Sequence, residues 1–495
     1  MIIENVMNTK VFGKDLRATA TLCLIVLLIL PLLTPLLPAA SATPELEDKL
    51  VLIGPVYKQE AESVIRGFKE YVKREFGKDI EVSYLSPGGW PVCVDRVRAW
   101  KGKPDADVFF GGGPPAYEVL KAEGLAEKYV PKTADNIPLQ AFGTYIKDPE
   151  GYWYAFSLWF ITIIYNNKVL KALNIPPPQT WDDLLNPIYR DRLVYTIPYA
   201  SGTMHEMVEL LITYKGWDEA WAYLRRLAVN TARFSTGSTD TLLIVERGEV
   251  PIGLAQPQMN AMMAQADGYD IIAVIPEVSL LVAEGVMMLK NAPHPNLAKL
   301  FMDWILSEEG QKYVLAGGYF PAHKDFRYSK YVNEIKMAQY AIKALGGADS
   351  FYDLKGIKAM NYDPKLAIER WDKINTMYEQ EIYRKLDELK STWRLIEDVQ
   401  AEISVQKSKG GDVTSSEAKL KEAITFFDKG QLAESRLAAQ TARQLLVQAP
   451  SAPPIPPQEK VPAYDTITIA AAVIIAIAIV ALAFILYRIR ILSKK

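Results

Sequence analysis

The chain has 495 residues, of which 49% are hydrophobic and 23% charged, so we expect a largely globular protein of more than one domain. Its formal net charge of -2 excludes broad nucleic-acid binding, which needs a basic surface. Its two cysteines are Cys23 and Cys93. Because we expect Cys23 to be removed with an N-terminal signal, the sequence predicts neither an intrachain disulfide nor a cysteine-rich metal site.

The N-terminal segment, residues 1–42, has the pattern of a secretory signal peptide. Lys10, Lys14 and Arg17 precede the apolar run LCLIVLLILPLLTPLLPAASA, which ends in small residues at Ala42. Prolines within this run disfavour a membrane-spanning helix. We therefore predict cleavage near Ala42, and an uncleaved anchor is the alternative.

Strand and helix patterns alternate from residue 46 to about residue 330. The short apolar run KLVLIGPV is followed by AESVIRGFKEYVKREFG, which has apolar residues at helical spacing and Gly77 as a C-cap. IEVSYL and ADVFF have the pattern of two further strands, and VCVDRVRAWKG has the pattern of a helix between them. This alternation predicts an α/β fold with a largely parallel sheet.

The strand pattern ADVFF ends in three glycines, Gly111 to Gly113, and two prolines then open the next helix. In open parallel sheets, ligands bind at the carboxyl ends of the strands. Glycines let a ligand approach the backbone closely, and a helix N-terminus favours an anion. We therefore predict a ligand contact at this turn. A tight strand-to-helix turn without a ligand is the alternative.

Three other strand-end loops share this arrangement: residues 54–57, 86–90 and 201–203. Ser201 or Thr203 would cap the helix that follows and offer donors to an oxyanion, with an ordinary N-cap as the alternative. The segment GYWYAFSLWFITIIYNN is rich in aromatic residues, and we expect Trp159 to line a cleft. The predicted ligand-binding residues from the four loops are Tyr57, Gly88, Gly89, Trp90, Gly111, Gly112, Gly113, Ser201, Gly202 and Thr203.

Enzyme motifs are scarce in the sequence. HEMVE from His205 approaches the zinc-protease pattern H-E-x-x-H, but Glu209 stands where the second histidine is needed. The chain has three histidines in all, and it lacks a nucleophile elbow, a Walker A loop and a dinucleotide fingerprint. We therefore predict that the protein is not an enzyme and carries no cofactor.

The C-terminal third changes character. We predict a helical stalk over residues 331–448 and a proline-rich spacer over 449–463. Residues 466–487 form an uncharged run long enough for a transmembrane helix, and basic residues follow in the tail 488–495. The expected localisation is a single-pass cell-membrane protein with an extracellular body and a cytoplasmic C-terminus.

An ordered set of motifs between residues 48 and 325 resembles the extracellular solute-binding proteins of ABC importers. More narrowly, it is similar to the type 2 group that includes ferric-iron-binding proteins, and the two terminal segments are similar to the archaeal membrane-anchored form. The motifs that carry this resemblance are DADVFFGGGPPAYEVLKAEGLAEKY (105–129), IIYNNKVLKAL (163–173), PQTWDDLLNPIYRDRL (178–193), SGT (201–203), VERGEVPIGLAQPQMNAMMAQADG (245–268) and VMMLKNAPHPNLAKLFMDWILSEEGQKYV (286–314).

The resemblance implies two α/β lobes with a ligand between them. Lobe 1 would comprise residues 46–150 and 275–325, and lobe 2 residues 155–270. The hinge would pass near Ile161–Tyr165 and Ile271–Pro276. A ligand that contacts both lobes only when they are closed favours the closed state, which is then presented to the permease subunits of the transporter.

The ligand stays open at this point. Ferric-binding relatives use adjacent tyrosines, whereas this chain has Tyr319 followed by Phe320 and no Tyr-Tyr pair. The resemblance leaves a ferric iron or metal–anion complex, an oxyanion such as a phosphonate or phosphate ester, and a sugar stacked on Trp90 and Trp159. Gln256 and Gln258 would add polar contacts from lobe 2, with helix-start packing as the alternative. An extracellular sensor or adhesion receptor on the same scaffold is the alternative function.

Overall fold

The computed structural model describes residues 45–360 and 363–448, which divide after Arg384 into two units. The predicted signal peptide, spacer, membrane span and tail lie outside the described residues. Within these residues, no helix combines the length and the apolar character needed to cross a bilayer. We therefore correct the expected localisation: a single-pass membrane anchor is not supported.

A nine-stranded mixed sheet runs through the first unit in the order β2-β1-β3-β12-β6-β9-β7-β8, with β10 also paired to β6. Its flanks are parallel, as the alternating pattern predicted, but its centre is antiparallel around β6 and β12. The strands are β1 (Lys49–Ile53), β2 (Glu81–Leu85), β3 (Val108–Phe110), β6 (Trp153–Asn166), β7 (Leu193–Tyr195), β8 (Thr231–Phe234), β9 (Ile252–Pro257), β10 (Ile271–Val274) and β12 (Leu281–Met288).

Strand β6 joins the two halves of this sheet. All 14 of its residues are buried, which explains why its sequence is continuously apolar and aromatic rather than alternating. It pairs with β12 through Phe160 and with β9 from Ile161 onward. The sheet therefore passes from lobe 1 to lobe 2 at the first residue of the predicted hinge.

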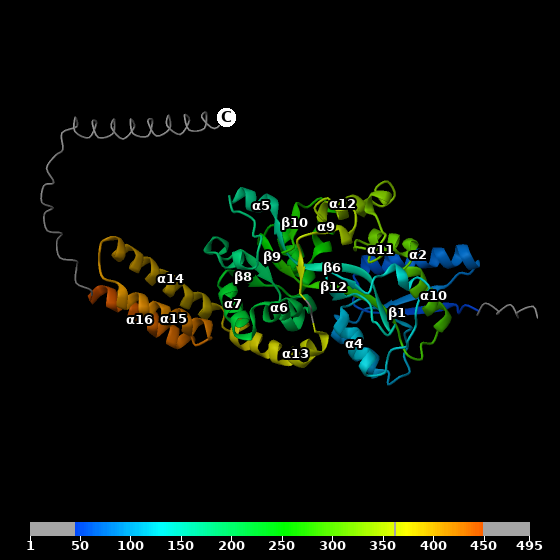
Figure 1. Ribbon diagram of the computed structural model, residues 1–495, viewed down its shortest axis with the longest axis horizontal. Coiled ribbons are helices and arrows are strands. Elements are labelled where there is room, and N and C mark those ends of the chain that lie inside the picture. Colours follow the sequence, from blue (N-terminus) through cyan, green and yellow to red (C-terminus); the bar gives the residue numbers. More distant parts are fainter. Residues whose placement is uncertain (1–44, 361–362, 449–495) are drawn as a thin grey trace, which may run out of the picture. The chain divides into compact units, whose positions relative to one another are not determined.

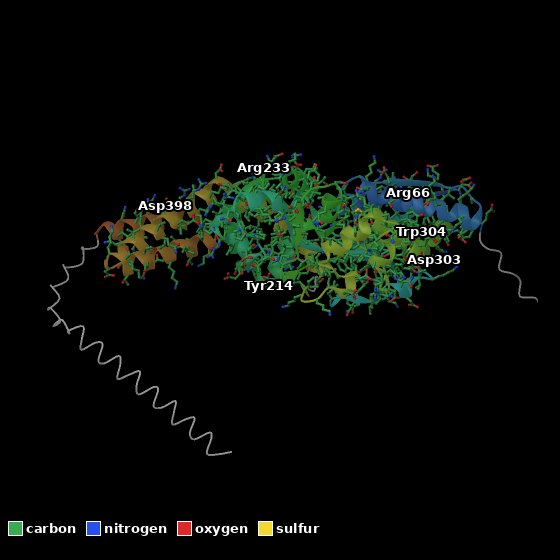
Figure 2. The ribbon with its side chains drawn as sticks, turned by 90° about the horizontal axis from the view of Figure 1, so that it is seen from above. Arg66, Tyr214, Arg233, Asp303, Trp304 and Asp398 are labelled. Carbon is green, nitrogen blue, oxygen red and sulfur yellow. The ribbon has the colours of Figure 1, made fainter. Side chains whose placement is uncertain are left out.

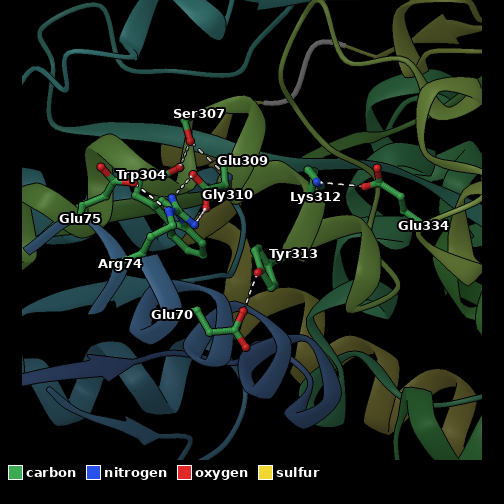
Figure 3. A network of polar contacts seen from close by, with 10 residues as sticks. All are labelled: Glu70, Arg74, Glu75, Trp304, Ser307, Glu309, Gly310, Lys312, Tyr313 and Glu334. Carbon is green, nitrogen blue, oxygen red and sulfur yellow. Dashed lines mark hydrogen bonds and ion pairs between the residues drawn. The ribbon is translucent and has the colours of Figure 1, made fainter. Parts of the chain in front are cut away.

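Helices cover both faces of each half of the sheet (Figure 1). On α11, Tyr313 donates a hydrogen bond to Glu70 of α2 at 2.7 Å, and Glu309 pairs with Arg74 (Figure 3). Trp304 of α10 is buried, whereas Arg66 and Arg233 lie on the surface (Figure 2). Lobe 1 contains α2 (Lys58–Phe76), α3 (Trp90–Ala99), α4 (Pro114–Ala122), α10 (Pro295–Ile305) and α11 (Glu308–Ala316), and lobe 2 contains α5 (Asn167–Ala172), α6 (Gly202–Lys215), α7 (Trp217–Val229), α8 (Ser238–Glu246) and α9 (Gln258–Ala266).

The first unit continues past residue 330, where the sequence analysis placed the end of the solute-binding domain. Helix α12 (Lys336–Ala344) packs on α9, and the short strand β13 (Lys358–Ala359) pairs with β11 (Val278–Ser279). Helix α13 (Pro364–Tyr378) contacts α4 of lobe 1 and α6 of lobe 2. Helical periodicity in the sequence could not reveal this, because it shows which face of a helix is apolar but not what covers that face.

We expect a fragment of residues 45–384 to unfold in one cooperative transition, and a fragment of residues 45–330 to be destabilised. The shorter fragment loses Ile374 and Tyr378, which are almost fully buried, and it exposes the surfaces of α4 and α6 that α13 covers and the surface of α9 that α12 covers. Thermal unfolding followed by circular dichroism measures both fragments. Equal melting temperatures would show that residues 331–384 add no stability.

The second unit is a helical bundle, as the sequence predicted. It consists of α14 (Leu386–Ser408), α15 (Thr414–Asp428) and α16 (Leu432–Gln448), which pack against one another. Leu389, Ile396, Val399 and Ile403 form the buried stripe of α14. Ser416 donates a hydrogen bond to the carbonyl of Ala442 at 2.6 Å, which ties α15 to α16.

Candidate functional site

The carboxyl ends of the strands of both lobes open into one cleft of about 700 Å³. Lobe 1 contributes the loops that follow β1, β2 and β3. Lobe 2 contributes the loops that follow β7, β8 and β9. Strand β6 and strand β12, which carry Trp159 and Glu284, line it as well. This is the position in which α/β sheets bind their ligands.

Three hydroxyl groups meet at the lobe 2 side of the cleft. Ser201 is the N-cap of α6, Thr203 lies in its first turn, and Ser238 is the first residue of α8. The Oγ of Ser201 lies 2.8 Å from the Oγ1 of Thr203 and 2.7 Å from the Oγ of Ser238, and the other two are 2.9 Å apart. We call this group the hydroxyl triangle. Two helix N-termini and three hydroxyl donors suit an anion that has several oxygen atoms.

Bare backbone faces the cleft from lobe 1. Gly112 has φ +84°, a left-handed conformation that favours glycine, and Gly113 is the N-cap of α4. A Cβ on Gly113 would lie 3.1 Å from the Oε1 of Glu206 in lobe 2, and one on Gly202 would lie 3.2 Å from the Nε1 of Trp90. The two walls of the cleft therefore approach so closely at these glycines that an added methyl group would crowd the opposite wall.

Two buried glutamates line the same cleft. Glu206 of α6 is 5% exposed and Glu284 of β12 is 8% exposed. Burial raises the pKa of Glu206 to about 8, and the charge of Glu284 adds to that rise. Burial also raises the pKa of Glu284 to about 7, which the Trp159 indole opposes. Glu60 lies buried on α2 nearby, and desolvation raises its pKa well above the usual range.

Aromatic side chains complete the walls. The rings of Tyr57 and Tyr319 meet edge to face with centroids 6.1 Å apart, and the hydroxyl of Tyr319 accepts a hydrogen bond from the backbone N–H of Tyr57 at 3.4 Å. Burial raises the pKa of Tyr57 to about 12, so its phenol stays neutral. At the rim, Trp90 packs against Trp371 of α13, with ring centroids 5.5 Å apart.

Most of the residues predicted from the sequence line this cleft, and three do not. Both polar groups of the Gly111 backbone are used inside lobe 1, by Gly285 and Tyr117. The Gln256 side chain bonds backbone carbonyls of its own strand and Asn260, and Gln258 donates to Ala344, so both pack structurally. Those that line it are Tyr57, Gly88, Gly89, Trp90, Gly112, Gly113, Trp159, Ser201, Gly202 and Thr203.

Several residues that line the cleft were not predicted from the sequence, although the sequence contained signals for some of them. Glu284 is a lone acid inside the apolar strand LVAEGVMM, which is an unusual place for a charge. Ser238 belongs to the segment STGST after β8, which has the same strand-to-helix character as the loop at Ser201. Glu206 and Tyr319 carried no such signal, because only the fold brings them to the cleft.

The described residues contain no group of three or more His, Cys, Asp or Glu side chains that could hold a metal ion. In the near-motif HEMVE, His205 stacks on Trp371 and Glu209 pairs with Arg370. Burial lowers the pKa of His205 to about 3, so this ring is a neutral packing group. Cys93 is a buried thiol whose pKa burial raises to about 12. Neither residue points to metal or nucleophilic chemistry.

Comparison with known proteins agrees with this architecture. The sequence profile of the family described as bacterial extracellular solute-binding protein matches residues 103–338. A putative 2-aminoethylphosphonate-binding periplasmic protein of Salmonella typhimurium is 26% identical over 244 residues, which are 48% of this chain and 67% of that protein. Two other curated relatives are covered over 56% and 73% of their own length.

Two solved structures show the same fold. The periplasmic binding protein AfuA of Actinobacillus pleuropneumoniae, with fructose-6-phosphate bound, superposes with a TM-score of 0.55 at 22% identity, over 68% of this chain and 98% of that one. Iron-bound HitA of Pseudomonas aeruginosa superposes with a TM-score of 0.53 at 20% identity, over 66% of this chain and 99% of that one. Both likenesses establish the two-lobe periplasmic-binding fold.

Proposed function

We propose that this protein is the extracellular receptor of an ABC importer for a small solute that carries a phosphonate or phosphate group. The two lobes would close on the solute, and the closed form would deliver it to the permease subunits. The hydroxyl triangle is the observation that carries this proposal. Its three hydroxyls lie at two helix N-termini and line the same cleft as the open backbone of Gly112 and Gly113.

The chemistry of the cleft supports a tetrahedral oxyanion over bare iron. A metal would need several carboxylate or imidazole ligands in one place, and the described residues offer no such group. An oxyanion needs hydrogen-bond donors, and the N-terminal turns of α6 and α8 supply N–H groups together with Ser201, Thr203 and Ser238. The position of these donors at the end of lobe 2, opposite lobe 1, would let one ligand bridge both lobes and favour closure.

We expect the double substitution Ser201→Ala with Thr203→Ala to weaken binding by about 10-fold or more, because it removes one or two hydrogen bonds to a charged group. Titration calorimetry with inorganic phosphate, 2-aminoethylphosphonate and fructose 6-phosphate measures this loss. Ser404→Ala with Thr425→Ala is the matched control, since those hydroxyls bond only to carbonyls of their own helices. Unchanged affinity in the first variant would remove this loop from the site.

A further inference from the structure

The polar groups of the cleft are of two opposite kinds. The hydroxyl triangle offers donors, whereas Glu206 and Glu284 offer only acceptors once they are ionised. The glutamates come from different elements, α6 and β12, and both are more than nine-tenths buried. The cleft therefore holds an anion-binding end and, a few residues further along α6, an acidic end.

No protein cation neutralises the acidic end within the described residues. Neither Glu206 nor Glu284 has a lysine, arginine or histidine within ion-pair distance, and the Oε2 of Glu284 has no hydrogen-bond partner. The basic residue that lines the cleft is Lys58, whose ammonium lies on the surface near Glu62, 3.6 Å from its carboxylate. A buried carboxyl without a partner is costly, so its presence in a binding cleft calls for a ligand that supplies the partner.

An acidic end also works against a ligand that is only an anion. A carboxylate in a poorly solvated cleft repels a phosphate or phosphonate group, and it would weaken binding of a simple oxyanion. A metal ion bridging the two glutamates would favour a third acidic, histidine or cysteine ligand, and the described residues form no group of three such side chains. A primary ammonium needs only two or three acceptors, which two carboxylates provide.

Resting on the proposed function, we infer that the solute is a zwitterion: an aminoalkyl phosphonate or an aminoalkyl phosphate ester. Its oxyanion lies at the hydroxyl triangle, and its ammonium lies between Glu206 and Glu284. The carboxylate of Glu206 lies opposite Gly113 of lobe 1, so it holds the ammonium only when both lobes are in place. Glu206 therefore contributes to the selectivity for the ligand as well as to its binding. Sugar phosphates and inorganic phosphate lack the cation and bind less tightly.

The test compares two ligands that share one oxyanion. 2-Aminoethylphosphonate and ethylphosphonate differ only in the ammonium, and titration calorimetry on the full protein measures both. We expect 2-aminoethylphosphonate to bind the native protein at least about 30-fold more tightly, on the scale of a charge-assisted contact. In Glu206→Gln with Glu284→Gln, we expect that preference to fall below about 3-fold, while ethylphosphonate binds as well as before or better.

Two controls make the outcome decisive. Glu417→Gln with Glu422→Gln changes the net charge equally in the second unit and should keep the preference. Binding of ethylphosphonate by the Glu206 and Glu284 variant shows that it is folded. If the native protein binds both phosphonates equally, or fructose 6-phosphate more tightly than 2-aminoethylphosphonate, the zwitterion inference is overturned and the oxyanion receptor stands. If no member of this set binds, both fall.

Discussion

Gly54→Ala should destabilise the protein more than any other single-methyl change at the cleft. A Cβ on Gly54 would lie 1.7 Å from the carbonyl oxygen of Phe110 and 2.6 Å from its carbon. Both atoms are backbone, so no side-chain rotation relieves the overlap, and β1 must separate from β3, to which it is paired at Ile53. We expect a loss of about 4 kcal/mol or more in the free energy of unfolding.

Gly89→Ala is the matched control for that substitution. Gly89 lies at the same end of the sheet and has φ −61°, and its added Cβ would meet only Pro91, at 3.6 Å. We expect this control to change the melting temperature by no more than a few degrees, and Gly54→Ala to lower it by about 10 °C or more. Thermal unfolding by circular dichroism compares them, and equal melting temperatures would mean that the β1–β3 contact yields without strain.

The sequence predicted the α/β class and the loops of the cleft because these depend on local signals. Glycine and proline that follow a strand, as at Gly112 and Gly113, are visible in the sequence. They indicate a strand-to-helix turn in any sheet topology. The antiparallel centre of the sheet was not predicted. Strands β6 and β12 are both buried along their whole length and mostly apolar, and such a pattern contains no information about the direction of the neighbouring strand.

The acidic end of the cleft shows where sequence reasoning stops. Glu206 lies in a helix and Glu284 in a strand nearly eighty residues later, and only the fold places them in one cavity. Gln256 and Gln258 show the opposite case: the sequence suggests that they contact the ligand, and in the fold they do not line the cleft. Amides after a strand look like ligand contacts, but here their nitrogens donate to backbone carbonyls inside the fold. Whether a polar residue near a site binds the ligand depends on the hydrogen-bond partners of its side chain, and the sequence does not show these partners.

The unliganded protein should lose stability as the pH rises from about 4.5 to about 8, and Glu206→Gln with Glu284→Gln should remove much of that loss. Burial raises the pKa of both carboxyls above 4.5, to about 8 for Glu206 and about 7 for Glu284. The folded state therefore binds more protons than the unfolded state in this window. Their stabilising contribution is complete below pH 4.5 and is lost as the pH passes through the folded-state pKa values.

Each fully shifted carboxyl changes the free energy of unfolding by about 1.4 kcal/mol per pH unit within its window. We expect the double variant to melt several degrees above the native protein near pH 8.5 and close to it near pH 5. The other groups at the cleft, Tyr57, Lys58, Glu60, Asp240 and Tyr319, are common to both proteins, so the comparison isolates the two glutamates. Parallel melting curves across this pH range would show that the two carboxyls are not shifted by burial.

The same measurement separates the two kinds of ligand. An ammonium between Glu206 and Glu284 stabilises their ionised forms, so a saturating aminoalkyl phosphonate should flatten the pH dependence and release protons on binding. Ethylphosphonate brings only negative charge and should leave the pH dependence as steep as in the unliganded protein or make it steeper. A zwitterion that stabilised the protein equally at pH 5 and pH 8.5, beyond what ethylphosphonate does, would place its ammonium away from the two glutamates.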